Sequence, residues 1–150
     1  IKVKKKIKDY FVKKYYQPDI QINLTKKLLK FANTSIDVSD GLIADLEKMI
    51  NKQKFSYQLY EDKIPISKTL FNLLKNKNLN KFNFVSNGDD YQILFTARID
   101  QSRIIVNTSK KLGIKISKIG KITSNKLKSV IIDQKGKQIL IKNKGYTHQF

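Results

Sequence analysis

The most informative stretch of the chain is TSIDVSDGLIADL, at residues 34–46. Its first five residues are rich in β-branched side chains, which predicts a short strand over 34–38. Ser39 and Asp40 are residue types that commonly precede helices, and apolar residues then recur at helical spacing from Leu42 to Ile50. We therefore expect a strand that leads directly into an amphipathic helix, with a polar turn between them.

The rest of the chain predicts a mixture of helices and strands. Apolar periodicity predicts helices at 2–16, 22–33, 67–79 and 104–112. Alternation and apolar runs predict strands at 55–59, 91–97, 130–132 and 139–141.

Several details of these elements can also be predicted. The almost continuously apolar run 91–97 predicts a central strand, and residues 133–137 predict a hairpin turn. Asp100 is a candidate N-cap, and Gly113 a candidate end, for the helix at 104–112. Residues 76–83 are expected to be a helix end and a loop. The mixed order favours an α+β fold, a layered α/β sandwich with a mixed sheet, over a doubly wound sheet.

Composition limits the class of protein. The chain has 150 residues, of which 40% are hydrophobic, and this suits one domain with a buried core. It contains no cysteine and no apolar run of membrane-spanning length, so we expect a soluble cytoplasmic protein. The sequence opens on Ile1 rather than Met, which is what a fragment would show.

The charge is strongly positive. Lys and Arg number 31 against 12 Asp and Glu, giving a formal net charge of +19. One interpretation is a surface that binds nucleic acid or an acidic membrane. The other is a compositional preference for lysine, because Arg98 and Arg103 are the only arginines. Base-reading proteins rely heavily on arginine, so we favour the second interpretation.

Acidic residues are scarce, and they cluster at two places. The first cluster, residues 37–41, lies at the start of the predicted helix, where N–H groups attract phosphate. Carboxylates beside a phosphate would need a divalent cation such as Mg²⁺ between them; the alternative is that Ser39 or Asp40 simply caps the helix. The second cluster, Asn87-Gly88-Asp89-Asp90-Tyr91, precedes an apolar strand. It needs solvent, a cation or a ligand, or else it is an exposed turn.

Together these clusters resemble motifs of the thiamine-monophosphate kinase family, in its C-terminal domain. The matching segments occur in the family's order: Tyr16-Gln17-Pro18, residues 35–46, Ile64-Pro65-Ile66-Ser67, residues 88–96, and the final segment Gly145-Tyr146-Thr147-His148-Gln149-Phe150. The resemblance runs from about residue 15 to residue 150. It implies a fold like the C-terminal domain of aminoimidazole-ribonucleotide synthetase.

The chain also departs from the family's pattern. The arginine expected after Pro18 is missing, the first carboxylate of the second motif is Asp89 rather than glutamate, and Gln149 precedes Phe150. The family's N-terminal nucleotide-binding domain has no counterpart. Residues 1–150 are therefore expected to be the C-terminal domain alone, and to be inactive without the other domain.

The resemblance implies a function in which ATP phosphorylates thiamine phosphate to thiamine diphosphate. It implies that Asp37 and Asp40 bind Mg²⁺, that Ser39 contacts ATP, and that Asp89 and Tyr146 contact thiamine phosphate. No catalytic residue acting as a general base is expected, because the reaction is mainly one of alignment and charge neutralisation.

Further partners and competing functions follow from the same reasoning. The resemblance implies an N-terminal domain of the same enzyme, a homodimer, and no membrane partner. Aminoimidazole-ribonucleotide synthetase and selenophosphate synthetase are neighbours in the superfamily. The alternative of another class is a non-enzymatic basic module that binds nucleic acid, with basic residues and exposed aromatic side chains on one face. The aromatic residues mostly follow the apolar periodicity, so we expect no nucleic-acid partner.

Overall fold

The structure is a computed structural model that describes residues 1–51, 54–124, 126–140 and 144–145. Its helices are α1 (Lys5–Tyr16), α2 (Ile22–Leu28), α3 (Leu42–Asn51), α4 (Lys68–Lys77), α5 (Phe82–Val85) and α6 (Ser102–Leu112). Its strands are β1 (Ala32–Asp37), β2 (Ser56–Tyr60), β3 (Ile93–Ala97), β4 (Gly120–Thr123), β5 (Val130–Ile132) and β6 (Gln138–Ile139).

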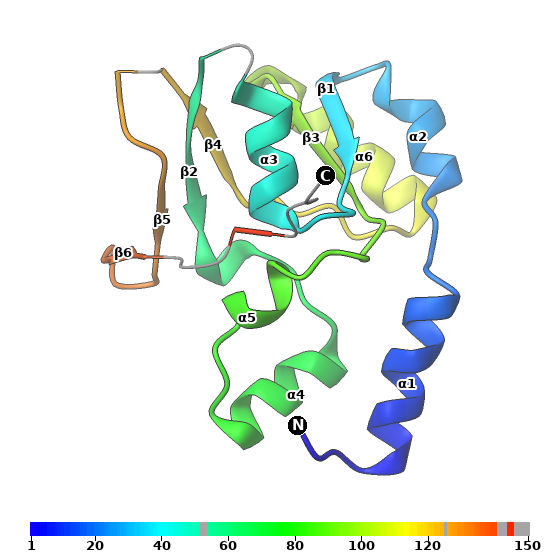
Figure 1. Ribbon diagram of the computed structural model, residues 1–150. Coiled ribbons are helices and arrows are strands. Elements are labelled where there is room, and N and C mark those ends of the chain that lie inside the picture. Colours follow the sequence, from blue (N-terminus) through cyan, green and yellow to red (C-terminus); the bar gives the residue numbers. More distant parts are fainter. Residues whose placement is uncertain (52–53, 125, 141–143, 146–150) are drawn as a thin grey trace, which may run out of the picture.

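The strands form two separate sheets (Figure 1). β1 and β3 pair antiparallel, with Ser35 opposite Phe95 and Asp37 opposite Ile93. The other sheet has the order β4-β2-β5-β6, in which β2 is antiparallel to β4 and parallel to β5. The second sheet is thus mixed, and the first ends beside the turn that leads into α3.

Helix α3 lies between the two sheets and is the centre of the main core (Figure 1). Ile43 and Leu46 of α3 are in one buried cluster with Leu59 of β2, Ile131 of β5 and Leu94 of β3. Ile43 is 1% exposed. Because one helix packs against both sheets, its N-terminal end is held firmly in place.

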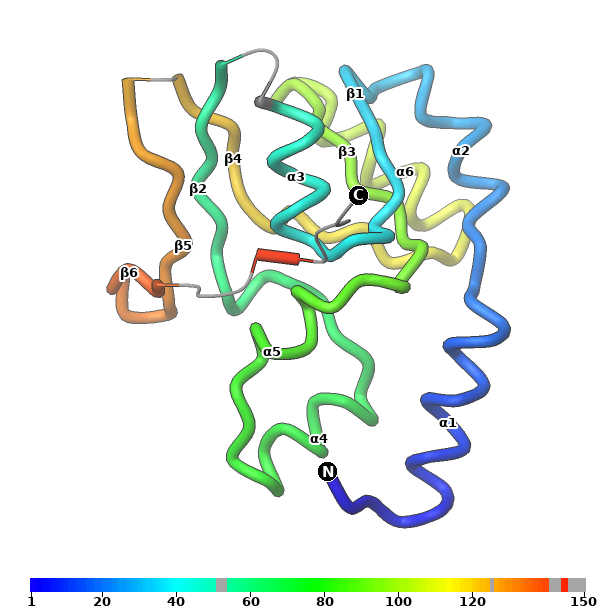
Figure 2. Tube along the Cα trace, in the orientation of Figure 1, coloured from blue at the N-terminus to red at the C-terminus, as the bar shows by residue number. Residues whose placement is uncertain are grey.

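A second core covers the opposite face of the β1–β3 sheet. Leu24 and Leu28 of α2 pack there against Phe31 and against the partly buried Phe95 of β3 and Ile105 of α6. Leu94 belongs to one core and its neighbour Phe95 to the other, as strand alternation requires. The layers are therefore α2 with α6, the β1–β3 sheet, α3, and the four-stranded sheet. Helix α1 extends away from these layers and buries no residue (Figures 1 and 2).

Most of the predicted elements are confirmed, including the layered α+β class, the 133–137 turn and Gly113 as a left-handed helix end. Three predictions were wrong. β3 is not central, because it pairs with β1 alone in a two-stranded sheet and is mostly half-buried. Asp100 does not cap α6, since a short 3₁₀ helix, Ile99–Gln101, precedes it and Gln101 is the N-cap. The helix predicted over 22–33 ends at Leu28 in α2, because the chain turns there and enters β1 at Ala32, where it pairs with β3. The segment 76–83 holds the end of α4 and a loop, as expected, before α5 begins at Phe82.

Candidate functional site

The two acidic motifs lie against each other through their main chains. The Asp89 N–H donates to the Ser39 carbonyl at 2.9 Å, and the Tyr91 N–H donates to the Val38 carbonyl at 2.9 Å. In return, the Val38 N–H donates to the Gln92 carbonyl at 2.8 Å. Figure 2 shows the green chain before β3 running beside the turn after β1. Two segments far apart in sequence thus form one structural unit, which we call the paired-loop site (residues 37–41 and 86–92).

Glycine is required where the two loops touch. Gly88 has φ +81°, and a Cβ on it would overlap the Ser39 carbonyl oxygen and lie 3.0 Å from the Asp40 carbonyl carbon. Gly41 has φ +117°, and a Cβ there would lie 2.6 Å from the Ser86 carbonyl oxygen. Both positions combine a backbone conformation that disfavours side chains with a lack of space. Each motif therefore depends on the glycine of the other for its packing.

The loop that contains Asp89 has an unusual backbone. Asp89 has φ +57° and Tyr91 has φ +49°, in the left-handed region that L-residues seldom adopt. The Tyr91 hydroxyl donates to an Asp89 carboxylate oxygen at 3.3 Å. Such strained residues cluster at functional sites, where the surrounding structure holds them in place.

The negative charges of this loop affect one another. The Asp89 carboxylate, by its charge and by its hydrogen bond, raises the pKa of the Tyr91 hydroxyl, and the Asp37 carboxylate adds to the effect. Desolvation by the surrounding protein atoms, and then the Asp89 charge, raise the pKa of Asp90. Asp37 and Asp89 are both exposed, on adjacent segments. The site is therefore electronegative, although the protein as a whole is strongly basic.

Asp45 holds the turn before α3. Its side chain is 1% exposed, and one carboxylate oxygen, Oδ2, accepts from the N–H groups of Ser39 at 2.9 Å, Asp40 at 2.9 Å and Gly41 at 3.2 Å. The N–H groups of the three residues before the helix are thus bound by a carboxylate that reaches back from within it. Sequence reasoning gave Asp45 no role. The one sign in the sequence that Asp45 has a structural role is that this acidic residue stands among the apolar residues of the helix.

The residues predicted to bind phosphate and metal are close in sequence but differ in environment. Asp37 is exposed at the end of β1, whereas Asp40 is only 15% exposed and forms an ion pair with Lys48. Hydrogen bonding to Asp40 is the main cause that raises the pKa of Lys48. Within the described parts of the chain, no group of three His, Cys, Asp or Glu side chains is arranged to hold a metal ion. Carboxylates suit Mg²⁺, so these two could supply only part of its ligands.

The segment at residues 144–145 reaches the same site. The Lys144 carbonyl accepts from the Ala44 N–H in the first turn of α3 at 3.0 Å, and Lys144 Nζ donates to Glu47 Oε1 at 2.8 Å. A Cβ on Gly145 would lie 2.6 Å from the Asp40 carbonyl oxygen. The start of the final motif therefore packs on the turn before α3. Tyr146, predicted to contact the substrate, lies outside the described residues.

The segment after Pro18 is also near the site. The Gln92 side-chain amide donates to the Asp19 carbonyl at 3.4 Å, and the Asp19 carboxylate forms an ion pair with Lys14. Three of the five segments that carry the family resemblance thus meet around the turn before α3: residues 35–46, residues 88–96 and, from the last segment, Gly145. Asp19, which follows the segment 16–18, bonds to Gln92 beside them. In the remaining segment, residues 64–67, Ser67 caps α4 by accepting from the Leu70 N–H at 3.1 Å.

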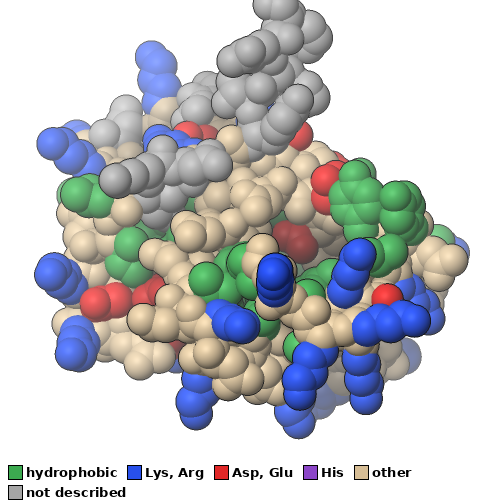
Figure 3. Space-filling model, turned by 60° about the horizontal axis from the view of Figure 1, so that its bottom comes forward, with side chains coloured by type: hydrophobic (Ala, Val, Ile, Leu, Met, Phe, Trp, Pro, Cys, Tyr) green, Lys and Arg blue, Asp and Glu red, His purple; other side chains and the backbone are tan. Residues whose placement is uncertain are grey.

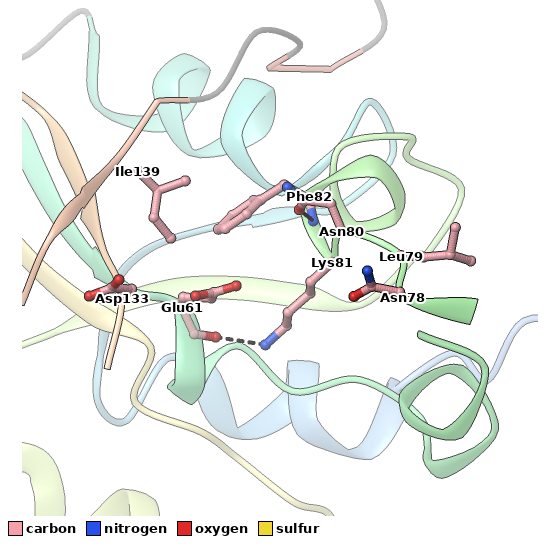
Figure 4. Close-up of a pocket in the computed structure, with 8 residues that line it drawn as sticks. All are labelled: Glu61, Asn78, Leu79, Asn80, Lys81, Phe82, Asp133 and Ile139. Atoms are coloured by element: carbon pink, nitrogen blue, oxygen red, sulfur yellow. Dashed lines mark hydrogen bonds between the residues drawn. The ribbon is translucent and has the colours of Figure 1, made fainter. Parts of the chain in front are cut away.

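A cavity of about 490 Å³ lies elsewhere, between the start of α5 and the β5–β6 turn (Figure 4). Three of its polar side chains, those of Asn80, Lys81 and Asp133, are engaged in holding the backbone. Lys81 donates to the Glu61 and Ile64 carbonyls, at 2.6 and 2.7 Å, and burial lowers its pKa. Asp133 Oδ1 accepts from the N–H groups of Lys135 and Lys137, both at 2.8 Å. We therefore regard the paired-loop site, and not this cavity, as the candidate site.

The basic side chains do not form one continuous patch on the face seen in Figure 3. Lys and Arg side chains lie along the outline and also across the lower middle of this face, with hydrophobic, acidic and other side chains exposed between them. This distribution gives no particular support to a nucleic-acid surface, which would gather basic residues on one face. Among the described residues, no helix is both long and apolar enough to cross a membrane.

Comparisons with known proteins give consistent results. The chain is 36% identical over 146 residues to the thiamine-monophosphate kinase of Buchnera aphidicola subsp. Acyrthosiphon pisum, covering 95% of this chain and 43% of the relative. The crystal structure of thiamine-monophosphate kinase from Stenotrophomonas maltophilia K279a superposes with a TM-score of 0.71 at 25% identity, over 93% of this chain and 42% of that one.

A structure described as AaThiL complexed with AMPPCP and TMP also has a TM-score of 0.71. It is 21% identical and supports the fold, over 98% of this chain and 44% of that one. No protein-family model matches the sequence. The chain spans less than half the length of the relatives that it matches.

Proposed function

We propose that this chain, which matches thiamine-monophosphate kinases in sequence and in fold, forms the C-terminal domain of an enzyme that phosphorylates thiamine phosphate. ATP would be the phosphoryl donor and thiamine diphosphate the product. The observation that carries this proposal is the meeting of the segments 37–41, 88–92 and 144–145 at one end of α3. These segments hold the residues through which the sequence resembles the kinases, and nothing in the two cores requires them to be acidic.

The chemistry asks for alignment more than for proton removal. Both the attacking phosphate and the transferred phosphoryl group are anionic, so the site must hold them in line and offset their repulsion. In the proposal, the Ser39 hydroxyl contacts a phosphate oxygen of ATP. The N–H groups of the turn cannot do this, since Asp45 already accepts from those of Ser39, Asp40 and Gly41.

Asp37 and Asp40 would hold Mg²⁺ together with phosphate oxygens and carboxylates from outside this chain. When bound, the cation would offset the charge of the phosphates. Asp37 offers an exposed carboxylate at a rigid strand end. Asp40 would have to exchange Lys48 for the cation, because the Lys48 ammonium lies on its carboxylate.

The loop at residues 86–92 would bind thiamine phosphate at its thiamine end, away from the phosphate. Asp89 is exposed and is oriented by a strained backbone, and a carboxylate there can accept from the aminopyrimidine of thiamine. Tyr146, the other residue proposed for this end, follows Gly145 in the sequence, and Gly145 packs on the turn before α3. An aromatic ring there could stack on the cationic thiazolium.

The partners in this proposal are ATP, thiamine phosphate and an N-terminal domain of the same enzyme. The matched relatives are more than twice as long as the matched segment, which leaves room for such a domain. We further propose a cytoplasmic homodimer for the complete enzyme.

The experiment that tests this function uses the protein encoded by the complete reading frame that contains this sequence. It is incubated with ATP, Mg²⁺ and thiamine phosphate, and thiamine diphosphate is measured by chromatography. Formation of thiamine diphosphate that requires both substrates would support the proposal. ATP turnover with aminoimidazole precursors or with selenide, and none with thiamine phosphate, would assign the chain to a neighbouring activity. The 150-residue chain assayed alone is expected to be inactive.

A further inference from the structure

Asp45 is the most deeply buried acidic residue among those described, and the proposed function gives it no contact with substrate. We infer that Asp45 is a positioning residue, whose carboxylate sets the conformation of the turn at residues 38–41 and so the directions of Ser39 and Asp40. This inference rests on the proposed function. It assigns a role to a residue in the interior of α3 rather than to one in the site itself.

The first argument is the number of donors on one oxygen. Asp45 Oδ2 accepts from three successive N–H groups, those of Ser39, Asp40 and Gly41. Three successive N–H groups that point at one atom define the curvature of the backbone between them. Because the carboxylate is held within the core, the turn takes its shape from α3.

The second argument is that ordinary helix capping does not account for these bonds. A capping side chain satisfies the free N–H groups of the first helical turn. Helix α3 begins at Leu42, so the donors belong to residues that precede it. The first-turn N–H of Ala44 has a separate acceptor, the carbonyl of Lys144. Asp45 therefore stabilises the turn that carries the site.

The third argument is a connection to Asp40. The second oxygen, Oδ1, accepts from Lys48 Nζ at 3.1 Å, and the same ammonium forms an ion pair with Asp40. Asp45 thus contacts the Asp40 backbone directly and its carboxylate through Lys48. Removing Asp45 should release both constraints, whereas asparagine keeps an oxygen acceptor for the N–H groups and loses only the ion pair.

The structural part of this inference is tested by amide hydrogen exchange, measured by NMR on the 150-residue chain. We compare wild type with Asp45→Ala and Asp45→Asn. Asp133→Ala is a matched control, because Asp133 also accepts from two backbone N–H groups of a turn, on the β5–β6 hairpin. In Asp45→Ala, exchange at Ser39, Asp40 and Gly41 should accelerate about tenfold or more relative to the β2–β4 amides. Asp45→Asn should retain most of the protection, and Asp133→Ala should affect only its own turn.

The functional part is tested with the same variants in the complete enzyme. Displacing a phosphate-binding group by about 1 Å can cost about 10²-fold in rate. We expect Asp45→Ala to lower kcat by about 10- to 100-fold with little change in the KM for thiamine phosphate. Asp45→Asn should recover most of the activity, and Asp133→Ala should match wild type.

The outcomes separate this inference from the proposed function. Unchanged exchange at residues 39–41 in Asp45→Ala would overturn the inference, whatever the activity. Faster exchange at residues 39–41 together with a normal kcat in Asp45→Ala would also overturn the inference, because the shape of the turn would then not matter to the reaction. If Asp45→Ala does not fold, Asp45→Asn decides: a partial loss of protection confined to residues 39–41 and Lys48, with a small fall in kcat, supports the inference. Protection lost at these residues with no fall in kcat, or protection and kcat both identical to wild type, contradicts it. If the wild-type enzyme does not phosphorylate thiamine phosphate, the proposed function fails, and the exchange data alone decide whether Asp45 sets the turn.

Discussion

Replacing Gly88 by alanine should break the contact between the two loops. The new Cβ would have to occupy the space of the Ser39 carbonyl oxygen, at a φ of +81°. The left-handed conformation costs a residue with a side chain about 1–2 kcal/mol. Moving the loop away would also weaken the bonds from Asp89 to Ser39 and from Tyr91 to Val38, each contributing about 0.5–1.5 kcal/mol. The free energy of unfolding should fall by about 2–5 kcal/mol, a large part of a typical total.

Gly136 provides a matched control for this change. It has φ +79°, almost the same as Gly88, but a Cβ on it would have no atom within 4 Å. Gly136→Ala therefore measures the conformational cost alone, about 1–2 kcal/mol. The difference between the two variants isolates the contact between the loops.

The assay is urea unfolding followed by circular dichroism, with thermal unfolding as a second measurement. For a chain of this size, 1 kcal/mol corresponds to about 2–4 °C, so Gly88→Ala should lower Tm by roughly 10 °C. In the complete enzyme, Gly88→Ala should also reduce kinase activity by more than Gly136→Ala does. Equal losses of stability in the two variants would refute the reasoning, because the close approach to Ser39 would then contribute nothing.

Three further predictions concern the charged and aromatic residues of the site. Asp37→Asn in the complete enzyme should lower activity about 10²-fold and change unfolding free energy by less than about 0.5 kcal/mol, because Asp37 is exposed; normal turnover at low Mg²⁺ would contradict its metal role. Tyr146→Ala should raise the KM for thiamine phosphate about tenfold and leave the KM for ATP unchanged; equal changes in both would exclude a role at the thiamine end. Asp90 has a raised pKa, so stability should fall as pH rises from its unfolded value of about 3.9 to the folded value. Asp90→Asn should therefore be more stable than wild type at pH 7 and equal to it near pH 3 by urea unfolding, and a constant difference would show that Asp90 is not the cause.

Local sequence signals were enough to predict most of the fold. The helix after residue 41 and the strand before it were predictable, because their apolar spacing matches the faces that meet the two cores. The position of β3 was not, since an almost continuously apolar run is equally compatible with a central strand and with a small sheet covered on both faces. Its partner β1 and the helices α2 and α3 are distant in sequence, and periodicity carries no information about such pairing.

The sequence was enough to predict which residues belong to the candidate site, but not how they are arranged in space. The two acidic clusters were recognisable because carboxylates are rare in this chain. The main-chain bonds between them depend on positive φ values at Asp89 and Tyr91, which aspartate adopts only occasionally and tyrosine seldom, so the residue types do not specify them. Ser39 and Asp40 were recognisable as possible helix caps by residue type, but nothing in the sequence indicated that Asp45 binds the N–H groups of the turn.

The contact of residues 144–145 with α3 also has a consequence for how the protein is made. A ribosome releases the chain from its N-terminal end, so α3 and both loops emerge before the segment that supplies the acceptor for the Ala44 N–H. The ion pair between Lys144 and Glu47 spans 97 residues, so forming it requires the closure of a long loop. The Ala44 N–H thus gains its acceptor only after a further hundred or so residues have emerged, and until then the beginning of α3 lacks the cover that residues 144–145 provide.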